Sequence, residues 1–411
     1  MRKKIKDLGR LAVIAALSAS LLAGCAGTST SGTASSANTE TTEAATTEAE
    51  TTTEAPTTEP EPVDNSYIPS ADTVKLLGRT YSCNDTLWLS YSASGVEFTA
   101  EGEEVTITIV GDSVAAYTND NHARFAVFAD GERVADQMLD SSSTTVTVPL
   151  SEDESTTIRV VKLSECAMSS IGISSIDVKG GTIAPTEYND LYIEFVGDSI
   201  TCAYGVDDED KSHSFSTSTE DATKSYAYKA AELLNADYSL VAISGYGVVS
   251  GYTSGEKNTS QLMPTYYESV GFSYGTIDGQ NVQDWAWDFE RQPDVVVINL
   301  GTNDASYAKS NEKREEFQAA YLEFLYQIRE KNPDAYIICS LGVMGGNLSQ
   351  YLGYAVDQFK EETGDEKVET CTLGQIKADE GYAADWHPTE ATHTRVADEI
   401  ATEIKSVLGL E

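Results

Sequence analysis

From residue 191 onward, short apolar runs alternate with longer segments of helical periodicity, and this alternation constrains the fold more than any other feature of the chain. Runs that stay apolar throughout are typical of strands buried on both faces. Parallel strands need long crossovers, which helices between the runs supply. We therefore expect an α/β domain in which helices cover both faces of a parallel sheet. The expected strands are residues 191–196, 238–243, 294–300, 335–341 and 367–372, and the expected helices include 224–234, 312–330 and 390–408.

The preceding region, residues 67–183, has a different periodicity. Apolar and polar residues alternate along 105–110, as a half-buried strand requires. Asp130-Gly131 separates two such runs and is a strong hairpin signal. Short strands divided by turns predict an all-β sandwich of the jelly-roll type. We therefore divide the folded part into a β-sandwich domain at 67–183 and an α/β domain at 184–411.

The N-terminal residues are expected to direct export. A basic start precedes an apolar run at 11–22 that is too short to span a bilayer comfortably. Leu22-Ala23-Gly24-Cys25 follows, and it is similar to the lipobox of bacterial lipoproteins. We interpret 1–25 as a lipoprotein signal peptide with Cys25 as the lipidated residue, and an ordinary signal peptide is the alternative. The protein would then lie on the extracellular face of the cell membrane, held there only by lipid.

Residues 26–66 are expected to be a disordered tether. Residues 28–62 are Thr, Ser, Ala, Glu and Pro with Gly and Asn, without an aromatic residue, Lys or Arg. Such a segment buries too little apolar surface to offset its ordering entropy.

Charge and cysteine content exclude several functions. With 66 acidic against 27 basic residues, the net charge is −39, so a nucleic-acid partner is excluded. The cysteines form no CxxC motif and no cluster with histidine, so we expect no structural metal site. Cys83 and Cys166 are the only pair inside the sandwich, and whether they form a disulfide stays open. We expect a monomer.

Four residues that support acyl transfer follow predicted strands or precede the last helix. Ser199, in Gly197-Asp198-Ser199, is a candidate nucleophile, and His387 is a candidate base. Asn303 and the Gly245 N–H are candidate donors to an oxyanion, together with the Ser199 N–H. Because ligands of parallel sheets bind beyond the carboxyl ends of the strands, these groups are expected to meet. Gly111-Asp112-Ser113 repeats the first motif without a helical crossover, and we interpret it as a turn.

The order of these motifs resembles the SGNH hydrolase superfamily, also called GDSL esterases. Its blocks I, II, III and V correspond to residues 197–201, Gly245, 301–304 and 385–387, and the resemblance covers 190–408. A β-sandwich in front makes the chain similar to carbohydrate esterase family 2, whose bacterial members deacetylate xylan and related polysaccharides. The resemblance implies a flavodoxin-like three-layer α/β sandwich preceded by a jelly roll, and catalysis without a cofactor.

One position departs from the wider superfamily. The acid of the triad usually lies three residues before the histidine, where this chain has Ala384, and the nearest acid is Asp385. We expect Asp385 either to reach the imidazole of His387 or to point away, leaving a backbone carbonyl to orient the ring. Family 2 is reported to include both arrangements.

The resemblance implies a serine carbohydrate esterase that removes O-acetyl groups from xylan, mannan or their oligosaccharides through an acetyl-enzyme. Trp386, Tyr204 and Tyr246 are expected to contact the sugar, and core packing is the alternative for Trp386. His393 is expected to be structural, and His213 to be a solvated loop residue, with a substrate contact as the alternative. Other readings are an SGNH lipase or thioesterase, a deacetylase of cell-wall polymers, and a non-catalytic carbohydrate-binding lipoprotein.

Overall fold

The computed structural model describes residues 64–115, 121–151 and 154–410. The expected signal peptide, Cys25 and all but the last residues of the expected tether lie outside this part of the chain. No helix among the described residues combines the length and apolar character that crossing a membrane requires.

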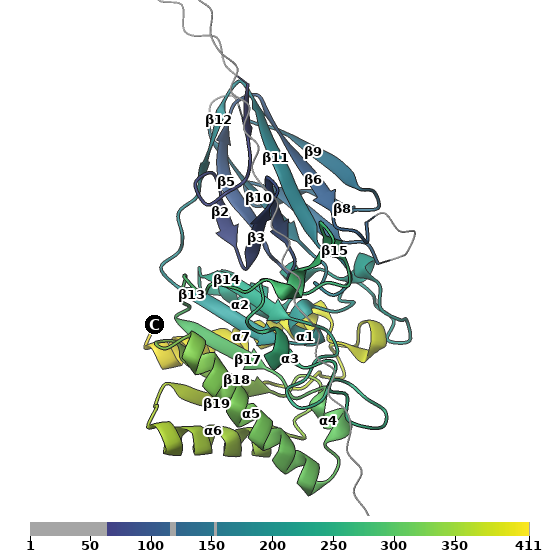
Figure 1. Ribbon diagram of the computed structural model, residues 1–411, viewed down its shortest axis with the longest axis vertical. Coiled ribbons are helices and arrows are strands. Elements are labelled where there is room, and N and C mark those ends of the chain that lie inside the picture. Colours follow the sequence, from purple (N-terminus) through teal and green to yellow (C-terminus); the bar gives the residue numbers. More distant parts are fainter. Residues whose placement is uncertain (1–63, 116–120, 152–153, 411) are drawn as a thin grey trace, which may run out of the picture. The chain divides into compact units, whose positions relative to one another are not determined.

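The first domain is a sandwich of two antiparallel sheets (Figure 1). One sheet has the order β3 (Thr80–Cys83), β4 (Thr86–Leu89), β11 (Ile171–Lys179), β6 (Glu104–Gly111) and β9 (Ser143–Pro149), with β1 (Asn65–Tyr67) also paired to β11. The other has the order β12 (Thr182–Pro185), β5 (Gly95–Glu101), β10 (Thr156–Lys162), β7 (Arg124–Ala129) and β8 (Glu132–Met138), with β2 (Lys75–Leu77) also paired to β5.

Period-two burial builds the core of this sandwich. Val105, Ile107 and Ile109 of β6 are fully buried, and the residues between them are only partly covered. The hairpin expected at Asp130-Gly131 joins β7 to β8. Because β1 and β12 both pair with sandwich strands, the domain runs from residue 65 to residue 185, slightly beyond the expected 67–183.

The second domain contains a five-stranded parallel sheet. Its order is β14 (Asp237–Ala242), β13 (Tyr192–Gly197), β17 (Val295–Asn299), β18 (Tyr336–Leu341) and β19 (Val368–Thr372). Each expected strand is confirmed to within one residue at either end. The helices α2 (Tyr226–Leu233), α5 (Asn311–Lys331) and α7 (Glu390–Leu408) match the expected ones, and α6 (Ser349–Thr363) packs beside α5.

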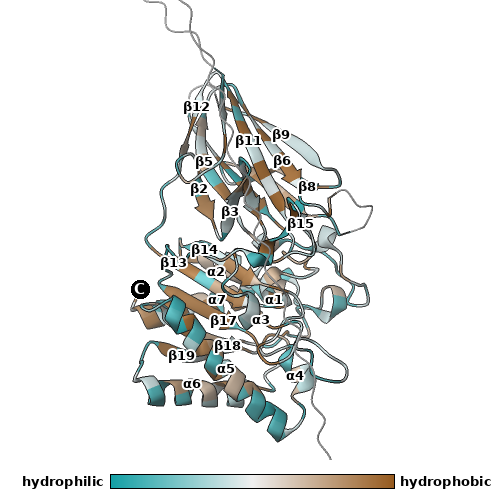
Figure 2. Ribbon diagram, viewed as in Figure 1, coloured by the Kyte–Doolittle hydropathy of each residue, from teal (hydrophilic) through white to brown (hydrophobic). Residues whose placement is uncertain are grey.

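Both faces of this sheet are buried, which explains the apolar runs. Val196 belongs to an apolar cluster with Phe317 and Leu325 of α5, whereas its neighbour Phe195 belongs to a second cluster with Ala227 of α2. Since α2 packs on α7, and α5 on α6, the sheet is the middle of three layers. Figure 2 shows the central strands in brown and the outer sides of the helices in teal.

Buried contacts join the two domains. Arg79 of the sandwich is fully buried and pairs with Glu194 of β13, with 3.0 Å between Nη2 and Oε2. The long loop between β14 and β17 also packs on the sandwich, where the rings of Tyr81 and Trp285 stack 4.0 Å apart. The turn expected at Gly111-Asp112-Ser113 is present, and Asp112 accepts a hydrogen bond from Ser273 of that loop at 3.1 Å. The described residues of both domains form one compact unit.

Candidate active site

Ser199 lies at the carboxyl end of β13, on the first residue of the short helix α1 (Ser199–Cys202). Asp198 caps this helix, because its Oδ1 accepts a hydrogen bond from the Ile200 N–H at 3.1 Å. Gly197 permits the tight turn, since a Cβ there would lie 2.0 Å from Oγ1 of Thr201. The turn leaves the Ser199 side chain at the sheet edge with 6% of its surface exposed.

His387 lies beside Ser199 although the two are 188 positions apart, with 2.9 Å between Nε2 and the serine Oγ. The other ring nitrogen, Nδ1, faces the backbone carbonyls of Ala384 at 3.3 Å and Asp385 at 3.2 Å. Two acceptors at Nδ1 require its proton there, so Nε2 is the free base that accepts from Ser199. Desolvation lowers the pKa of His387 to about 4, against the opposing effect of the two carbonyls, so the ring is neutral at pH 7.

The carboxylate of Asp385 does not reach His387. Its Oδ2 instead accepts hydrogen bonds from the Tyr204 hydroxyl at 2.8 Å and from the Phe215 N–H at 3.2 Å. Asp385 and Trp386 both have positive φ, 49° and 65°, and this backbone turn directs the Asp385 carbonyl rather than its side chain toward the imidazole. Of the two arrangements expected from the sequence, the geometry matches the one with a backbone carbonyl.

Tyr204, expected to contact sugar, lies against the candidate base His387. Its ring stacks on His387 with centroids 4.0 Å apart and on Phe215 at 4.4 Å. Burial, together with the hydrogen bond to Asp385, raises the pKa of its hydroxyl, so it stays a donor. Tyr204 therefore holds both the ring of His387 and the loop that follows Ala384. Stacking of this kind leaves no signal in the sequence.

The candidate oxyanion donors lie at the ends of the neighbouring strands. Gly245 follows β14 with φ of 83°. Asn303 follows β17, and its Nδ2 donates to the Tyr246 carbonyl at 2.8 Å and to Oδ2 of Asp198 at 3.1 Å. Both hydrogens of the Asn303 amide are thus donated to protein acceptors, and an oxyanion has to replace one of these acceptors to be bound by Asn303. Desolvation raises the pKa of Asp198 to about 7, an effect increased by the nearby carboxylate of Asp304.

Asp304 holds the loop that follows Gly245. Its Oδ1 accepts hydrogen bonds from three consecutive N–H groups, those of Val248 at 2.9 Å, Val249 at 2.7 Å and Ser250 at 3.0 Å. The carboxylate is fully buried, so these bonds replace its hydration. Sequence reasoning assigned no role to this residue, although the Asn-Asp pair at the end of a strand was visible.

The aromatic residues near the site differ in exposure. Trp386 is 54% exposed, and the Nζ of Lys211 lies 3.9 Å from its ring centroid. Tyr246 is only 2% exposed and packs against Tyr266 and Phe272, so the structure does not place it at a sugar-binding surface. Tyr252, which is 65% exposed, donates its N–H to the Gly245 carbonyl at 2.8 Å and was missed as a candidate.

Two further histidines, His393 and His213, are held by hydrogen bonds. His393 is buried on α7, and its Nδ1 accepts from the Tyr226 N–H at 3.2 Å, in agreement with a structural role. His213 contacts Asp208 through its side chain, and its carbonyl accepts from the Asp385 N–H at 3.0 Å. His213 therefore supports the loop of the candidate base.

Cysteines and possible metal ligands are dispersed over the part of the chain that the structure describes. The five described cysteines are free thiols, and Cys166 donates to the Ala242 carbonyl at 3.4 Å, so no disulfide joins it to Cys83. Among the described residues, 64–115, 121–151 and 154–410, no group of three or more His, Cys, Asp or Glu side chains could hold a metal ion.

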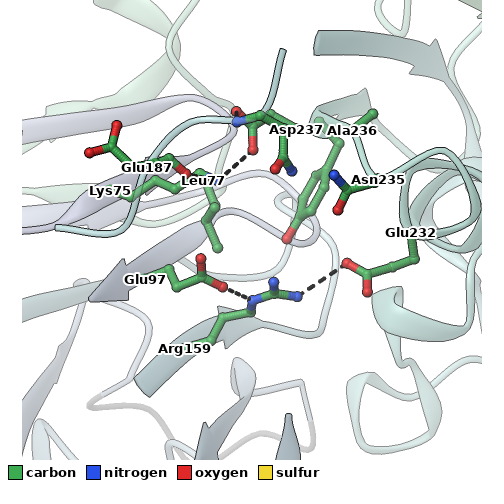
Figure 3. A pocket seen from close by; sticks show the side chains of 11 residues that line it. Lys75, Leu77, Glu97, Arg159, Glu187, Glu232, Asn235, Ala236 and Asp237 are labelled. Atoms are coloured by element: carbon green, nitrogen blue, oxygen red, sulfur yellow. Dashed lines mark hydrogen bonds and ion pairs between the residues drawn. The ribbon is translucent and has the colours of Figure 1, made fainter. Parts of the chain in front are cut away.

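A cavity of about 220 Å³ lined by charged side chains lies at the amino ends of the sheet strands, away from the carboxyl ends where Ser199 lies (Figure 3). It opens at Asp237, the amino end of β14, whereas Gly245 lies beyond the carboxyl end of the same strand. Lys75 pairs with Asp237 there, and Arg159 pairs with Glu97 and Glu232. The pairs Lys75–Asp237 and Arg159–Glu232 join the sandwich to the α/β domain, and Ser199 does not line the cavity.

Comparison with known proteins identifies both domains. Residues 195–395 match the GDSL-like Lipase/Acylhydrolase family, and residues 76–186 match the carbohydrate esterase 2 N-terminal domain. The chain therefore has a GDSL-like lipase/acylhydrolase domain behind the N-terminal domain of carbohydrate esterase family 2. The resemblance and the fold class expected from the motifs are thus confirmed.

Two curated relatives share this architecture in part. Cellulase/esterase CelE of Acetivibrio thermocellus is 31% identical over 327 residues, which cover 78% of this chain and 38% of the relative. The acetylxylan esterase / glucomannan deacetylase of Cellvibrio japonicus is 26% identical over 231 residues, 53% of this chain and 60% of the relative. The chain therefore spans less than two thirds of the length of either relative.

Solved structures extend the match over both domains. A family two carbohydrate esterase from Clostridium thermocellum, in complex with cellohexaose, has a TM-score of 0.71 and 29% identity, and covers 82% of this chain and 99% of its own. An acetyl xylan esterase from the rumen bacterium Butyrivibrio proteoclasticus has a TM-score of 0.76 and 26% identity, and covers 84% and 99%.

Proposed function

We propose that this chain is a serine carbohydrate esterase that removes O-acetyl groups from a plant-type polysaccharide such as xylan or mannan. The observation that carries the proposal is the 2.9 Å approach of Ser199 Oγ to a neutral His387 beside the Gly245 and Asn303 loops. The names of the relatives, an acetylxylan esterase / glucomannan deacetylase and a cellulase/esterase, support the substrate class.

The first half of the reaction is attack on the acetyl carbonyl by Ser199. Nε2 of His387 takes the serine proton, and the carbonyls of Ala384 and Asp385 face the Nδ1–H of the resulting imidazolium. The negative charge on the carbonyl oxygen is stabilised by the Ser199 and Gly245 N–H groups and by the Asn303 amide.

The second half releases the products. The tetrahedral intermediate collapses when Nε2 of His387 returns its proton to the sugar oxygen, which leaves as an alcohol. A water molecule then attacks the acetyl-serine, again with His387 as base, and acetate departs as the serine regains its proton. Atoms and charge balance without a metal or an organic cofactor.

Trp386 is proposed as the sugar-stacking platform beside this pair. More than half of the side chain is exposed, and it lies next to His387 in the chain. Lys211 and Tyr382 contact the ring, which restricts its rotation. Trp386→Ala is expected to raise KM for an acetylated oligosaccharide about fivefold, through a loss of ~1 kcal/mol of ring contact, and to leave 4-nitrophenyl acetate less affected.

The decisive experiment is acetate release from a panel of acetylated xylan, acetylated mannan, O-acetylated peptidoglycan and a long-chain nitrophenyl ester. We expect release from xylan or mannan, and a Ser199→Ala variant without activity. Preference for the long-chain ester would favour a lipase, and preference for peptidoglycan a cell-wall deacetylase. Glycan binding without acetate release, unchanged in Ser199→Ala, would overturn the enzymatic proposal.

Lipid anchoring at Cys25 outside the cell membrane is proposed from the sequence alone. Cys25→Ala in the full chain, expressed in a bacterium, is expected to move the protein from the membrane fraction to the medium. An unchanged distribution would contradict the lipid anchor while leaving the catalytic proposal intact.

A further inference from the structure

A short segment of the sandwich reaches the carboxyl end of β14, next to the candidate oxyanion loop. It follows β10 and contains Glu165, whose Oε2 accepts a hydrogen bond from the Ser244 N–H at 2.9 Å. The adjacent Cys166 donates to the carbonyl of Ala242, the last residue of β14, at 3.4 Å. Ser244 immediately precedes Gly245, so this contact from the other domain is one peptide away from a proposed oxyanion donor.

Glu165 is itself fixed on both sides of its backbone. Its carbonyl accepts from Nζ of Lys162 at 2.7 Å, and its N–H donates to Oε2 of Glu220 at 2.7 Å. All three side chains are at most 1% exposed. The carboxylate that meets Ser244 is therefore held in place by neighbours from both domains and has little freedom to turn away.

We propose that Glu165 is a positioning residue for the oxyanion hole, supplied by the sandwich domain. By accepting the Ser244 N–H, it fixes the peptide that leads into Gly245, which has no side chain of its own to restrain the backbone. Asp304 holds Val248, Val249 and Ser250 at the far end of the same loop. The loop is thus anchored at both ends, and the upstream anchor comes from the sandwich.

The cost of this arrangement argues against a purely structural role. Desolvation raises the pKa values of Glu165 and Glu220 and lowers that of Lys162, so burial of all three side chains is unfavourable. Replacing buried charged groups of this kind by apolar side chains of similar volume is often neutral or stabilising. What an apolar side chain cannot do is accept the Ser244 N–H, and this is the property that the proposal invokes.

The inference rests on the proposed acyl transfer. Its test uses three variants to distinguish the effect of the hydrogen-bond acceptor at residue 165 from the effects of its charge and its volume. Glu165→Gln keeps an oxygen that can accept from Ser244, Glu165→Met keeps the volume without the acceptor, and Glu165→Asp keeps the charge but is one methylene too short. Glu97→Met is the matched control, because Glu97 is also a buried sandwich glutamate at the domain interface, and its pair with Arg159 lines the cavity at the amino end of β14 (Figure 3).

Initial rates on 4-nitrophenyl acetate and the affinity of phenylboronic acid, which forms a tetrahedral adduct with the serine, are the readouts. Misplacing a catalytic group by about 1 Å costs up to about 100-fold, so kcat of the Met and Asp variants is expected to fall about 10- to 100-fold at unchanged KM. Boronate binding should weaken in parallel. Glu165→Gln is expected to stay within about fivefold of wild type, because a neutral hydrogen bond is only about half as strong as a charged one and the acceptor is retained.

Equal activity of all Glu165 variants would overturn the inference, as would an equal loss in Gln, Met and Asp. A loss of kcat in Glu97→Met of the same size would assign the effect to the interface as a whole. If the melting curve shows that Glu165→Met does not fold, the kcat of Glu165→Asp is compared with that of Glu165→Gln, and equal values would overturn the inference. Wild-type protein without serine-dependent activity would instead contradict the proposed function.

Discussion

Replacing Asp385 by Asn tests how the base is oriented. In a triad whose carboxylate binds the histidine, this change lowers kcat about 10⁴-fold, because the imidazole loses its tautomer and its charge partner. Here Nδ1 of His387 faces two backbone carbonyls, at 3.3 Å and 3.2 Å, which the substitution leaves in place. The carboxylate binds Tyr204 and Phe215 instead.

The expected loss follows from those two hydrogen bonds. Both donors bind Oδ2, so an Asn oxygen in that place still accepts from both, and the substitution replaces a charged acceptor by a neutral one at a cost of roughly 0.5–1.5 kcal/mol. If the whole cost reached the transition state, kcat would fall at most about tenfold.

The assay is kcat and KM on 4-nitrophenyl acetate and on acetylated xylan at pH 7. Asp210→Asn is the matched control for the loss of one negative charge, because Asp210 is an exposed residue of the neighbouring loop that contacts Ser212. Ser199→Ala sets the floor. A fall of 1000-fold or more in Asp385→Asn, with Asp210→Asn unchanged, would show that the Asp385 carboxylate turns to His387 during the reaction and would refute the geometry argued above.

Further predictions concern the base, the oxyanion hole and the domain interface. Because desolvation lowers the pKa of His387 to about 4, the neutral base predominates above that pH, and the decline of kcat/KM that belongs to His387 should have its midpoint near pH 4; a midpoint near 6.5 that remains in Asp198→Asn would contradict the buried ring. Asn303→Ala should lower kcat about 100- to 1000-fold with little change in KM, and equal kcat would remove Asn303 from the oxyanion hole. Glu194→Ala leaves Arg79 buried without its partner and should lower the free energy of unfolding in urea by about 3 to 5 kcal/mol, whereas Glu103→Ala, in an exposed pair, should have little effect.

Much of the architecture follows from local sequence patterns. A strand buried on both faces must be apolar at every position, so the five strands of the parallel sheet could be predicted to within one residue. Sites of parallel sheets form at the carboxyl ends of the strands, and this rule predicted that Ser199 and His387 meet although they lie far apart in the chain. The same reasoning identified Gly111-Asp112-Ser113 as a turn, because no helix follows it.

Side-chain direction in the loops was not accessible in this way. Asp385 precedes His387 by two positions, but the positive φ values of Asp385 and Trp386 turn its carboxylate toward Tyr204. Tyr246 resembled a sugar contact, yet it is buried against Tyr266. These outcomes depend on which non-local groups compete for each side chain, and a local pattern does not contain that information.

Hydrophobic periodicity and motif chemistry are properties of neighbouring residues, so the two folded domains, the positions of the strands along the chain and the candidate residues for acyl transfer could be predicted from the sequence. The positions of the backbone carbonyls at Nδ1 of His387, and the contact of Glu165 with Ser244 of the other domain, could be established only from the folded chain. Both are contacts across long stretches or sharp turns of the chain, where packing selects one hydrogen-bond partner among several that the sequence allows.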